Sequence, residues 1–376
     1  MTAENTTVPL CIERISARAF RNLAHVDVLP GPRFNVIAGD NGQGKTSLLE
    51  AIYLAATSRS FRTNRISELI AHGEAIASSK LVVIRGEDTS EQSIGLSMAG
   101  GARQARIDGK RPQSLAAFAA HTPVVVFHPG EVALSTGSSS ERRRLLDRVV
   151  LHTAFSKMGD LAAYTRAMRE RQQALESRGD RAADLEEWET LMVRHGSAVC
   201  SARAEASTRI AEVAQVAFDR IAAPGLVLGA RYVTNAPIEP AAYAAVLASS
   251  RTRDRIRKSA AIGPQRDDLV LEVDGRSARQ VASQGQHRAI VLALKAAEID
   301  VIATARGVRP ILLLDDVSSE LDRARTGALI SFLGEQRGQV FLTTTRPELI
   351  ESDRLGGPSG RHDFRVEQGA LVPSRD

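Results

Sequence analysis

The chain has 376 residues, a formal net charge of +5 and a hydrophobic content of 43%. These values are typical of a folded chain of about two domains and exclude wholesale disorder. Its two cysteines, Cys11 and Cys200, are too few and too far apart for a disulfide framework or a CxxC zinc site. No apolar stretch approaches the ~20 residues of a membrane helix, and the first residues lack the pattern of a secretory signal. We therefore expect a cytoplasmic protein.

The first third of the chain has the alternating apolar pattern of strands, interrupted by one helical run. Asn22 and the Pro30–Pro32 segment separate the first apolar stretches from one another. The pattern predicts a helix over 46–57 and strands over 11–19, 26–29, 34–38, 81–85, 94–98, 106–108 and 124–127.

The middle of the chain has a different texture. No proline occurs between Pro129 and Pro224, and charged residues of both signs alternate with Leu and Ala at helical spacing. Balanced charges on long helices are typical of exposed, ion-paired arms. The segment Arg178–Asp180 is the predicted reversal between two antiparallel helices.

Alternation of strands and helices resumes after Pro224. The sequence there predicts strands over 226–233, 269–273, 311–314, 340–343 and 364–366, helices over 290–302 and 324–333, and a Gly/Pro loop over 356–360. The whole pattern indicates an α/β protein with an inserted pair of helical arms.

A glycine-rich loop lies between the predicted strand 34–38 and the helix that follows it, where it satisfies the pattern GxxxxGK[ST]. Glycines let backbone N–H groups converge on phosphate oxygens, and the helix N-terminus adds positive potential. We expect Lys45 to reach the β- and γ-phosphates and the Thr46 hydroxyl to bind Mg²⁺. The nucleotide-binding residues predicted here are Gly39, Asp40, Asn41, Gly42, Gln43, Gly44, Lys45 and Thr46.

Two carboxylates end the apolar strand 311–314. In a P-loop protein such a strand brings a carboxylate to the Mg²⁺ held by the loop. We expect Asp315 to lie on the metal side and Asp316 to act as the catalytic residue, orienting or deprotonating the attacking water.

The motifs around this strand resemble those of the ABC ATPase superfamily. Ser283-Gln284-Gly285-Gln286 resembles its LSGGQ signature, and Ser319-Glu320-Leu321-Asp322 resembles its D-loop. The resemblance implies that ATP joins two subunits head to tail, with the signature of one covering the phosphates bound by the other. It also implies an ABC-type P-loop ATPase head, a mixed sheet with flanking helices, formed by residues 1–122 and 262–376. Residues 123–261 would form the inserted, coiled-coil-like arm subdomain.

Further motifs are similar to those of the RecF family, bacterial DNA replication and repair proteins of the ABC/SMC type. They cover the chain from about residue 12 to 345. Besides the P-loop, signature and D-loop, they are Ala19–Asn22, Leu49–Ile52, Ser60–Arg62, Gly137–Asp147 and Gly263–Asp268.

This resemblance implies an ATP- and Mg²⁺-dependent recombination mediator that binds gapped or stalled-fork DNA as an ATP-dependent homodimer. It would help to load RecA together with RecO and RecR, and would support the SOS response. The expected partners are duplex DNA and gapped junctions of single- and double-stranded DNA, and single-stranded DNA is a further candidate partner. No membrane partner is expected.

Departures from the family pattern bear on hydrolysis. Ser139 replaces a usual proline and His287 a usual glutamine, and Thr343-Thr344-Thr345 stands where ABC transporters have a switch histidine. A threonine cannot offer a cationic imidazole to the γ-phosphate, so slow hydrolysis is expected. The sequence does not decide whether the chain is an enzyme. If it is one, we expect a weak, DNA-dependent ATPase that hydrolyses ATP to ADP and phosphate and acts as a switch.

Two other functions are weighed. An ABC transporter ATPase subunit would need a membrane partner and a switch histidine, and an SMC-like chromosome organiser would need far longer arms than the ~80 residues available. The local clusters of basic residues are compatible with two interpretations, a DNA interface or solvated helix faces. Candidate DNA contacts are Arg142, Arg143 and Arg144, with Arg148 beside them, and Arg251, Arg253, Arg255, Arg257 and Lys258.

Overall fold

The computed structural model describes residues 8–221, 225–316, 338–350 and 360–373. The chain divides into two compact units, Met1–Glu131 with Ile302–Asp376, and Val132–Val301. The domain boundaries expected from the sequence, after residues 122 and 261, stay a prediction. The D-loop motif, the helix expected over 324–333 and most of the loop at 356–360 lie outside the described residues.

The first unit contains a six-stranded sheet in the order β14-β13-β3-β12-β11-β7. The five strands from β13 to β7 are parallel to their neighbours, and β14 is antiparallel to β13. β3, β7, β11 and β12 are buried along nearly their whole length, which explains their continuous apolar sequences. The strands are β3 (Phe34–Ala38), β7 (Val124–Phe127), β11 (Ile311–Leu314), β12 (Val340–Thr344), β13 (Arg361–Glu367) and β14 (Ala370–Pro373).

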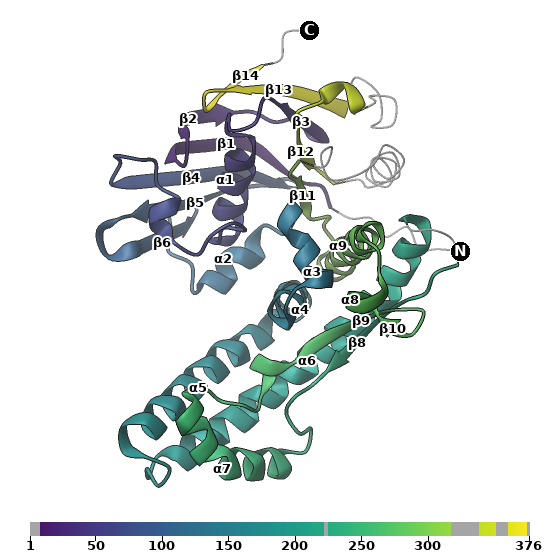
Figure 1. The fold of residues 1–376 in the computed structure, drawn as a ribbon. Coiled ribbons are helices and arrows are strands. Elements are labelled where there is room, and N and C mark those ends of the chain that lie inside the picture. Colours follow the sequence, from purple (N-terminus) through teal and green to yellow (C-terminus); the bar gives the residue numbers. More distant parts are fainter. Residues whose placement is uncertain (1–7, 222–224, 317–337, 351–359, 374–376) are drawn as a thin grey trace. The chain divides into compact units, whose positions relative to one another are not determined.

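A second, antiparallel sheet of the same unit has the order β2-β1-β4-β5-β6. Helix α1 (Lys45–Thr57) contacts strands of both sheets and is buried on almost all sides (Figure 1). Because only one face of the antiparallel sheet is covered, buried and accessible residues alternate along β4 and β5. The strands are β1 (Leu10–Phe20), β2 (Leu23–Val28), β4 (Ile76–Arg85), β5 (Asp88–Ser97) and β6 (Ala102–Ile107).

The elements expected among the described residues of this unit are present, but several have other bounds: β2 begins at Leu23 and β6 at Ala102, and β14 was not predicted. Strands β4 and β5 are each about twice as long as predicted. The first half of each strand, residues 76–80 and 88–93, is rich in Ser and other polar residues that obscure the apolar alternation. Helix α2 (Leu115–His121) was not predicted, since Phe118 is its only large side chain that is buried. Ser114 caps α2 by accepting a hydrogen bond from the Ala117 N–H.

The second unit is built from long helices beside a small antiparallel sheet, β10-β9-β8. The predicted reversal is confirmed: α5 ends at Arg178, and Gly179 follows with a φ of +86°. Helix α7 was not predicted and packs against both α5 and α6 (Figure 1). The elements are α3 (Ala133–Thr136), α4 (Ser139–Thr153), α5 (Met158–Arg178), α6 (Leu185–Ile221), β8 (Leu228–Val233), α7 (Pro240–Arg257), β9 (Asp268–Val273), β10 (Arg276–Ser277) and α8 (Ala278–Val281), and α9 (Gln284–Arg306) begins here. No helix among the described residues is long and apolar enough to cross a membrane.

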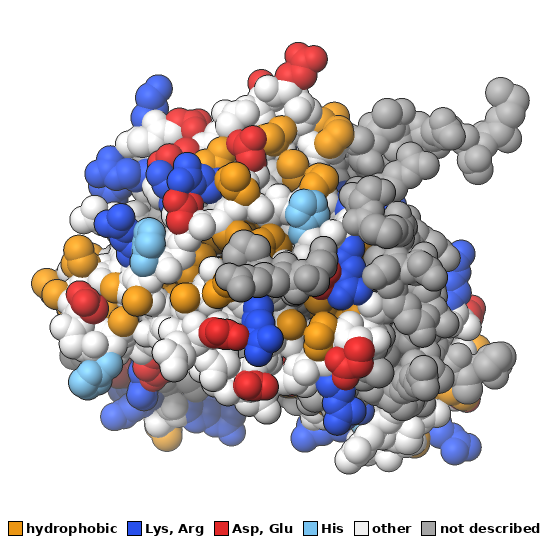
Figure 2. Space-filling view, turned by 90° about the horizontal axis from the view of Figure 1, so that it is seen from above, with side chains coloured by type: hydrophobic (Ala, Val, Ile, Leu, Met, Phe, Trp, Pro, Cys, Tyr) orange, Lys and Arg blue, Asp and Glu red, His pale blue; other side chains and the backbone are white. Residues whose placement is uncertain are grey.

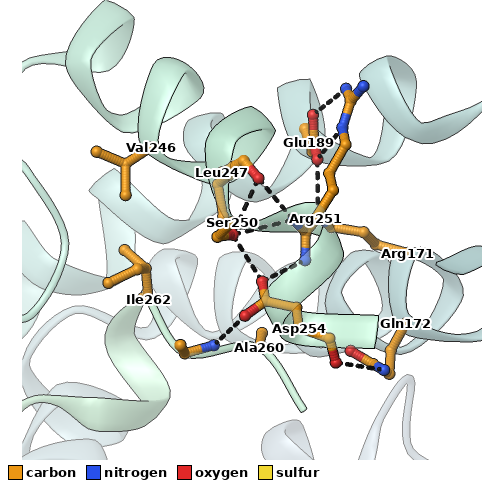
Figure 3. A network of polar contacts seen from close by, with 12 residues as sticks. Arg171, Gln172, Glu189, Val246, Leu247, Ser250, Arg251, Asp254, Ala260 and Ile262 are labelled. Atoms are coloured by element: carbon orange, nitrogen blue, oxygen red, sulfur yellow. Dashed lines mark hydrogen bonds and ion pairs between the residues drawn. The ribbon is translucent and has the colours of Figure 1, made fainter. Parts of the chain in front are cut away.

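A buried ion network joins the three arm helices (Figure 3). Arg171 of α5 donates to Glu189 of α6 at 2.9 Å and to Asp254 of α7 at 2.9 Å, and all three side chains are at most 6% exposed. Asp254 also accepts from Ser250 at 2.7 Å, and Arg251 forms a second ion pair with Glu189. Because these charges are desolvated, each depends on its partners.

We predict that Arg171→Met lowers the free energy of unfolding of the arm by about 3–5 kcal/mol, because two carboxylates stay buried without their cation. Urea unfolding followed by fluorescence of Trp188, the only tryptophan and part of the arm, measures this. Arg253→Met, at an exposed position of α7, is the control. Equal stability of the two variants would contradict a structural role for the network.

Candidate nucleotide site

The P-loop has the strand–loop–helix form that the sequence predicts. β3 ends at Ala38 and α1 begins at Lys45, so the loop residues 39–44 lie at the carboxyl edge of the parallel sheet. Gly42 and Gly44 have φ values of +80° and +120°, a region that L side chains rarely adopt. A Cβ at Gly44 would also lie 3.0 Å from the Leu23 side chain. The loop therefore needs glycine here, and the α1 N-terminus provides N–H donors for an anion.

Two turns between neighbouring strands form hydrogen bonds with the P-loop region. Between β1 and β2, the Asn22 side chain donates to the Gly42 carbonyl at 3.0 Å and accepts from Ser47 Oγ at 2.7 Å. Between β13 and β14, the Gln368 N–H donates to Gln43 Oε1 at 2.6 Å, and the Gly369 N–H donates to the Gln43 carbonyl at 2.9 Å. The Gln43 side chain, predicted to bind nucleotide, is thus engaged with this second turn. Asp40 and Asn41 are exposed.

Lys45 lies against the loop itself. Its Nζ donates to the carbonyls of Gly39 and Asp40, at 2.7 and 2.9 Å, and the residue is 6% exposed. Burial lowers the pKa of the Lys45 ammonium below its usual value, and nearby carboxylates, Asp316 above all, oppose this shift. A bound polyphosphate would oppose it in the same way.

Thr46 and Asp315 are brought together, as predicted, by the strands that precede them. Thr46 Oγ1 donates to Asp315 Oδ1 at 2.8 Å, and Thr343 Oγ1 donates to the same oxygen at 2.9 Å. Burial raises the pKa of the Asp315 carboxyl, and these two hydrogen bonds oppose that shift. Thr343 Oγ1 also accepts from the Asp316 N–H at 2.8 Å. Thr343, the first residue of the Thr343-Thr344-Thr345 run, therefore contacts both carboxylate residues.

A cavity of about 500 Å³ opens over these residues. Its lining includes Gly42, Gly44, Lys45, Thr46 and Asp316, and also Arg21, Asn22 and Arg62. No group of three or more His, Cys, Asp or Glu that could hold a metal occurs among the residues described. Mg²⁺ in phosphate sites takes only one or two protein oxygens, so the Thr46–Asp315 pair fits such an ion.

The two arginines of this cavity were not predicted as site residues. Both reach Glu50, which is fully buried: Arg21 binds it through two hydrogen bonds of 2.7 Å, and Arg62 lies 3.5 Å away. Ser60 donates a further hydrogen bond to the same carboxylate. The segments Ala19–Asn22, Leu49–Ile52 and Ser60–Arg62 were noted only as family motifs. They form one cluster that presents two cations to the cavity.

The signature residues lie in the second unit, at the start of α9. Ser283 Oγ accepts from the Gln286 N–H at 3.3 Å, and Gln286 Oε1 accepts from the Ser283 N–H at 2.7 Å. This reciprocal pair is a capping box. Ser283 and Gln284 are exposed and Gly285 is partly buried, so the positive end of the helix is accessible. His287 is buried and hydrogen-bonded to Ser135 Oγ at 2.7 Å.

Several arginines of the predicted DNA contacts have intramolecular partners. Arg142 forms a bidentate ion pair with Asp268, at 2.7 and 2.9 Å, and Arg143 donates to the Asp267 carbonyl at 2.6 Å. Arg251 is paired with Glu189 in the arm network. Arg148 is paired with Glu298 at 2.6 Å, and the remaining candidates are exposed: Arg144 beside Glu141, Arg255 near Asp180, and Arg253, Arg257 and Lys258. On the face seen in Figure 2, basic and acidic side chains of the described residues are interspersed.

Known proteins resemble the chain over nearly its whole length. The family model described as "RecF/RecN/SMC N terminal domain" matches residues 11–355. The DNA replication and repair protein RecF of Anaeromyxobacter sp. (strain Fw109-5) is 38% identical, covering 96% of this chain and 98% of its own. The protein of the same name from Geobacter sulfurreducens is 36% identical, covering 96% and 99%.

Solved structures agree with these relatives. The recombination mediator protein RecF with ATP, of the RecFOR pathway, has a TM-score of 0.87 at 25% identity, with all of both chains covered. An Smc head domain from Pyrococcus furiosus has a TM-score of 0.55 at 15% identity over 97% of this chain and 96% of its own, a likeness of fold alone. The ABC-type ATPase head with an inserted helical arm is thereby confirmed, and the chain belongs to the RecF family of DNA replication and repair proteins.

Proposed function

We propose that the chain is an ATP-dependent, DNA-binding recombination mediator acting at gapped or stalled-fork DNA in the cytoplasm. It would help RecA loading with RecO and RecR and support the SOS response. The relatives named for DNA replication and repair, and the solved RecF–ATP structure of the RecFOR pathway, support this role.

The observation that carries the proposal is the Thr46–Asp315 hydrogen bond, whose threonine lines the same cavity as Lys45 and Asp316. A P-loop threonine beside the carboxylate of a distant strand is the arrangement of an ATP–Mg²⁺ site. Thr46 and Asp315 would hold Mg²⁺, which neutralises phosphate charge when bound. Lys45, Arg21 and the loop N–H groups would bind the phosphates.

The resemblance of Ser283–Gln286 to the ABC signature supports dimerisation, because in such ATPases the signature of one subunit covers the phosphates bound by the other. The P-loop belongs to the first unit and Ser283 to the second. The accessible α9 N-terminus can accept a phosphate bound by another subunit. ATP would therefore join two chains head to tail.

Hydrolysis would be slow and would serve to release the dimer. Asp316 lines the cavity and would orient or deprotonate the attacking water. The neighbouring Thr343 hydroxyl is already engaged with Asp315 and the Asp316 N–H. It offers no positive charge to the γ-phosphate.

Light scattering of the protein with and without ATP and a short duplex tests the proposal as a whole. We expect a monomer that becomes a dimer with ATP, and DNA binding that depends on that dimer. A dimer contacting about six to ten phosphates should lose on the order of a thousandfold in affinity between about 50 and 200 mM salt. Equal DNA affinity without nucleotide would contradict the proposal.

Lys45→Met should abolish measurable ATP binding, because it removes a buried cation from a site for several phosphate charges. Isothermal titration of the folded variant with Mg²⁺–ATP measures the affinity. Lys110→Met, which removes an exposed lysine, should bind ATP as the wild type does. Wild-type affinity in Lys45→Met would refute the P-loop assignment.

Asp316→Asn should slow ATP hydrolysis by on the order of 100-fold and trap an ATP-bound dimer, since an amide keeps the shape but cannot accept the water's proton. Asp315→Asn should instead raise the Mg²⁺ concentration needed for ATP binding. Phosphate release and Mg²⁺ titrations separate the two effects. If Asp316→Asn hydrolysed ATP at the wild-type rate, the base would have to be another residue.

Ser283→Arg should leave ATP binding intact but prevent ATP-dependent dimerisation, because the arginine fills the space at the α9 N-terminus. Ser283→Ala removes the cap hydroxyl without adding bulk, at a cost of about 1 kcal/mol in stability, and should still dimerise. Sedimentation with ATP compares the two variants. A normal dimer of Ser283→Arg would show that this helix end lies outside the interface.

A further inference from the structure

The antiparallel sheet of the first unit has an outer face on which none of the described helices of that unit packs. Its inner face is apolar and packs on α1 and α2, through residues such as Leu81, Ile94 and Leu96. The outer face has the opposite character. Its hollow of about 540 Å³ is lined by side chains of all five strands, β2, β1, β4, β5 and β6.

Small residues form the floor of this hollow. Ser78 of β4 lies opposite Gly95 of β5, and Ser93 lies opposite Lys80. Ser16 of β1 lies on the other side of Lys80. Because these positions carry short side chains, the sheet backbone is accessible between longer neighbours.

Long basic side chains surround the floor. The lining contains four Lys or Arg side chains and a single carboxylate, Asp27. Arg14 binds Asp27 at 2.5 Å and lowers the pKa of that carboxyl to about 2, so the pair stays ionised and neutral overall. Lys80 is paired with Glu91 at 3.0 Å.

Arg18 and Arg106 supply the positive charge that remains. Both are exposed, and within the described part of the chain no carboxylate forms an ion pair with either. Arg106 donates only to the Gly109 carbonyl, at 2.9 Å. Arg106 lies two residues, about 7 Å, further along the strands than the position level with Arg18, and their strands β6 and β1 are three strand spacings, about 14 Å, apart. Duplex DNA carries about eight phosphate charges over that length.

The lining also indicates which part of a nucleic acid fits. It contains serine hydroxyls and the Gln104 amide, which donate hydrogen bonds to phosphate oxygens, but no Phe, Tyr or Trp on which a base could stack. Of the candidate arginines of the second unit, Arg142, Arg143, Arg148 and Arg251 are engaged with acidic residues or carbonyls, whereas the other candidates are exposed.

We infer that the outer face of the β2-β1-β4-β5-β6 sheet binds the phosphate backbone of DNA, with Arg18 and Arg106 as its main cations. The inference rests on the proposed function, DNA binding, and assigns that function to a surface. Charge complementarity and the small-residue floor carry it.

Ser78→Glu, with Ser78→Gln as its matched control, tests the surface. Ser78 is exposed between Arg18 and Gly95, and the two new side chains differ in charge but hardly in shape. Fluorescence anisotropy with a labelled duplex, in the presence of ATP, should show an affinity loss on the order of tenfold for Glu, because a like charge faces the phosphates. Gln should bind within about twofold of the wild type, as a neutral side chain adds no repulsion.

A second pair of variants removes charge without adding any. Arg18→Ser with Arg106→Ser should lower the slope of log affinity against log salt by about 1.8 per subunit, since two phosphates are no longer neutralised. Arg65→Ser with Arg231→Ser removes two exposed arginines elsewhere and should leave the slope unchanged. An equal fall in both double variants would show an effect of net charge alone and would overturn the inference.

ATP binding and dimerisation of each variant are measured alongside, and should match the wild type because the face lies outside the nucleotide cavity. If the wild type itself bound no DNA with ATP, the proposed function would fail. If it bound DNA and Ser78→Glu bound equally well, the function would stand and the sheet face would be excluded. That second result is also expected for a face that binds an acidic protein.

Discussion

A hydrogen bond of 2.8 Å between Thr46 Oγ1 and Asp315 Oδ1 joins two segments that are 269 positions apart. It forms because β3 and β11 are parallel strands of one sheet, so the residues that follow them meet at its carboxyl edge. β12 lies between these two strands and contributes Thr343 to the same oxygen. The cavity, the nucleotide it would hold and the dimer that nucleotide would join all depend on this edge.

Many arginines of the chain form intramolecular ion pairs with buried carboxylates. Glu50 holds Arg21 at the cavity, the arm helices are joined through Arg171, and Glu298 of α9 binds Arg148 of α4. Burying such pairs costs desolvation, which their hydrogen bonds and mutual attraction offset. These arginines position helices and loops, and fewer are left to contact DNA than the composition suggests.

The site is divided in a way that suits a switch. The phosphate-binding loop and the Asp315 strand belong to one unit, whereas the capped α9 N-terminus with Ser283 belongs to the other. ATP bound across two subunits would therefore complete both sites at once. The Thr343 hydroxyl binds the Asp315 carboxylate and the Asp316 N–H without adding charge.

The sequence by itself determined the P-loop, the Asp315 strand, the helical arm and the family, because these depend on local patterns: glycines with positive φ, apolar periodicity and short motifs. Only the tertiary structure placed Arg21 and Arg62 on Glu50, engaged Arg142 with Asp268, and left the outer sheet face open. The partners of these three arginines lie many residues away in sequence. They become known only when the packing of sheets and helices brings them within hydrogen-bond distance.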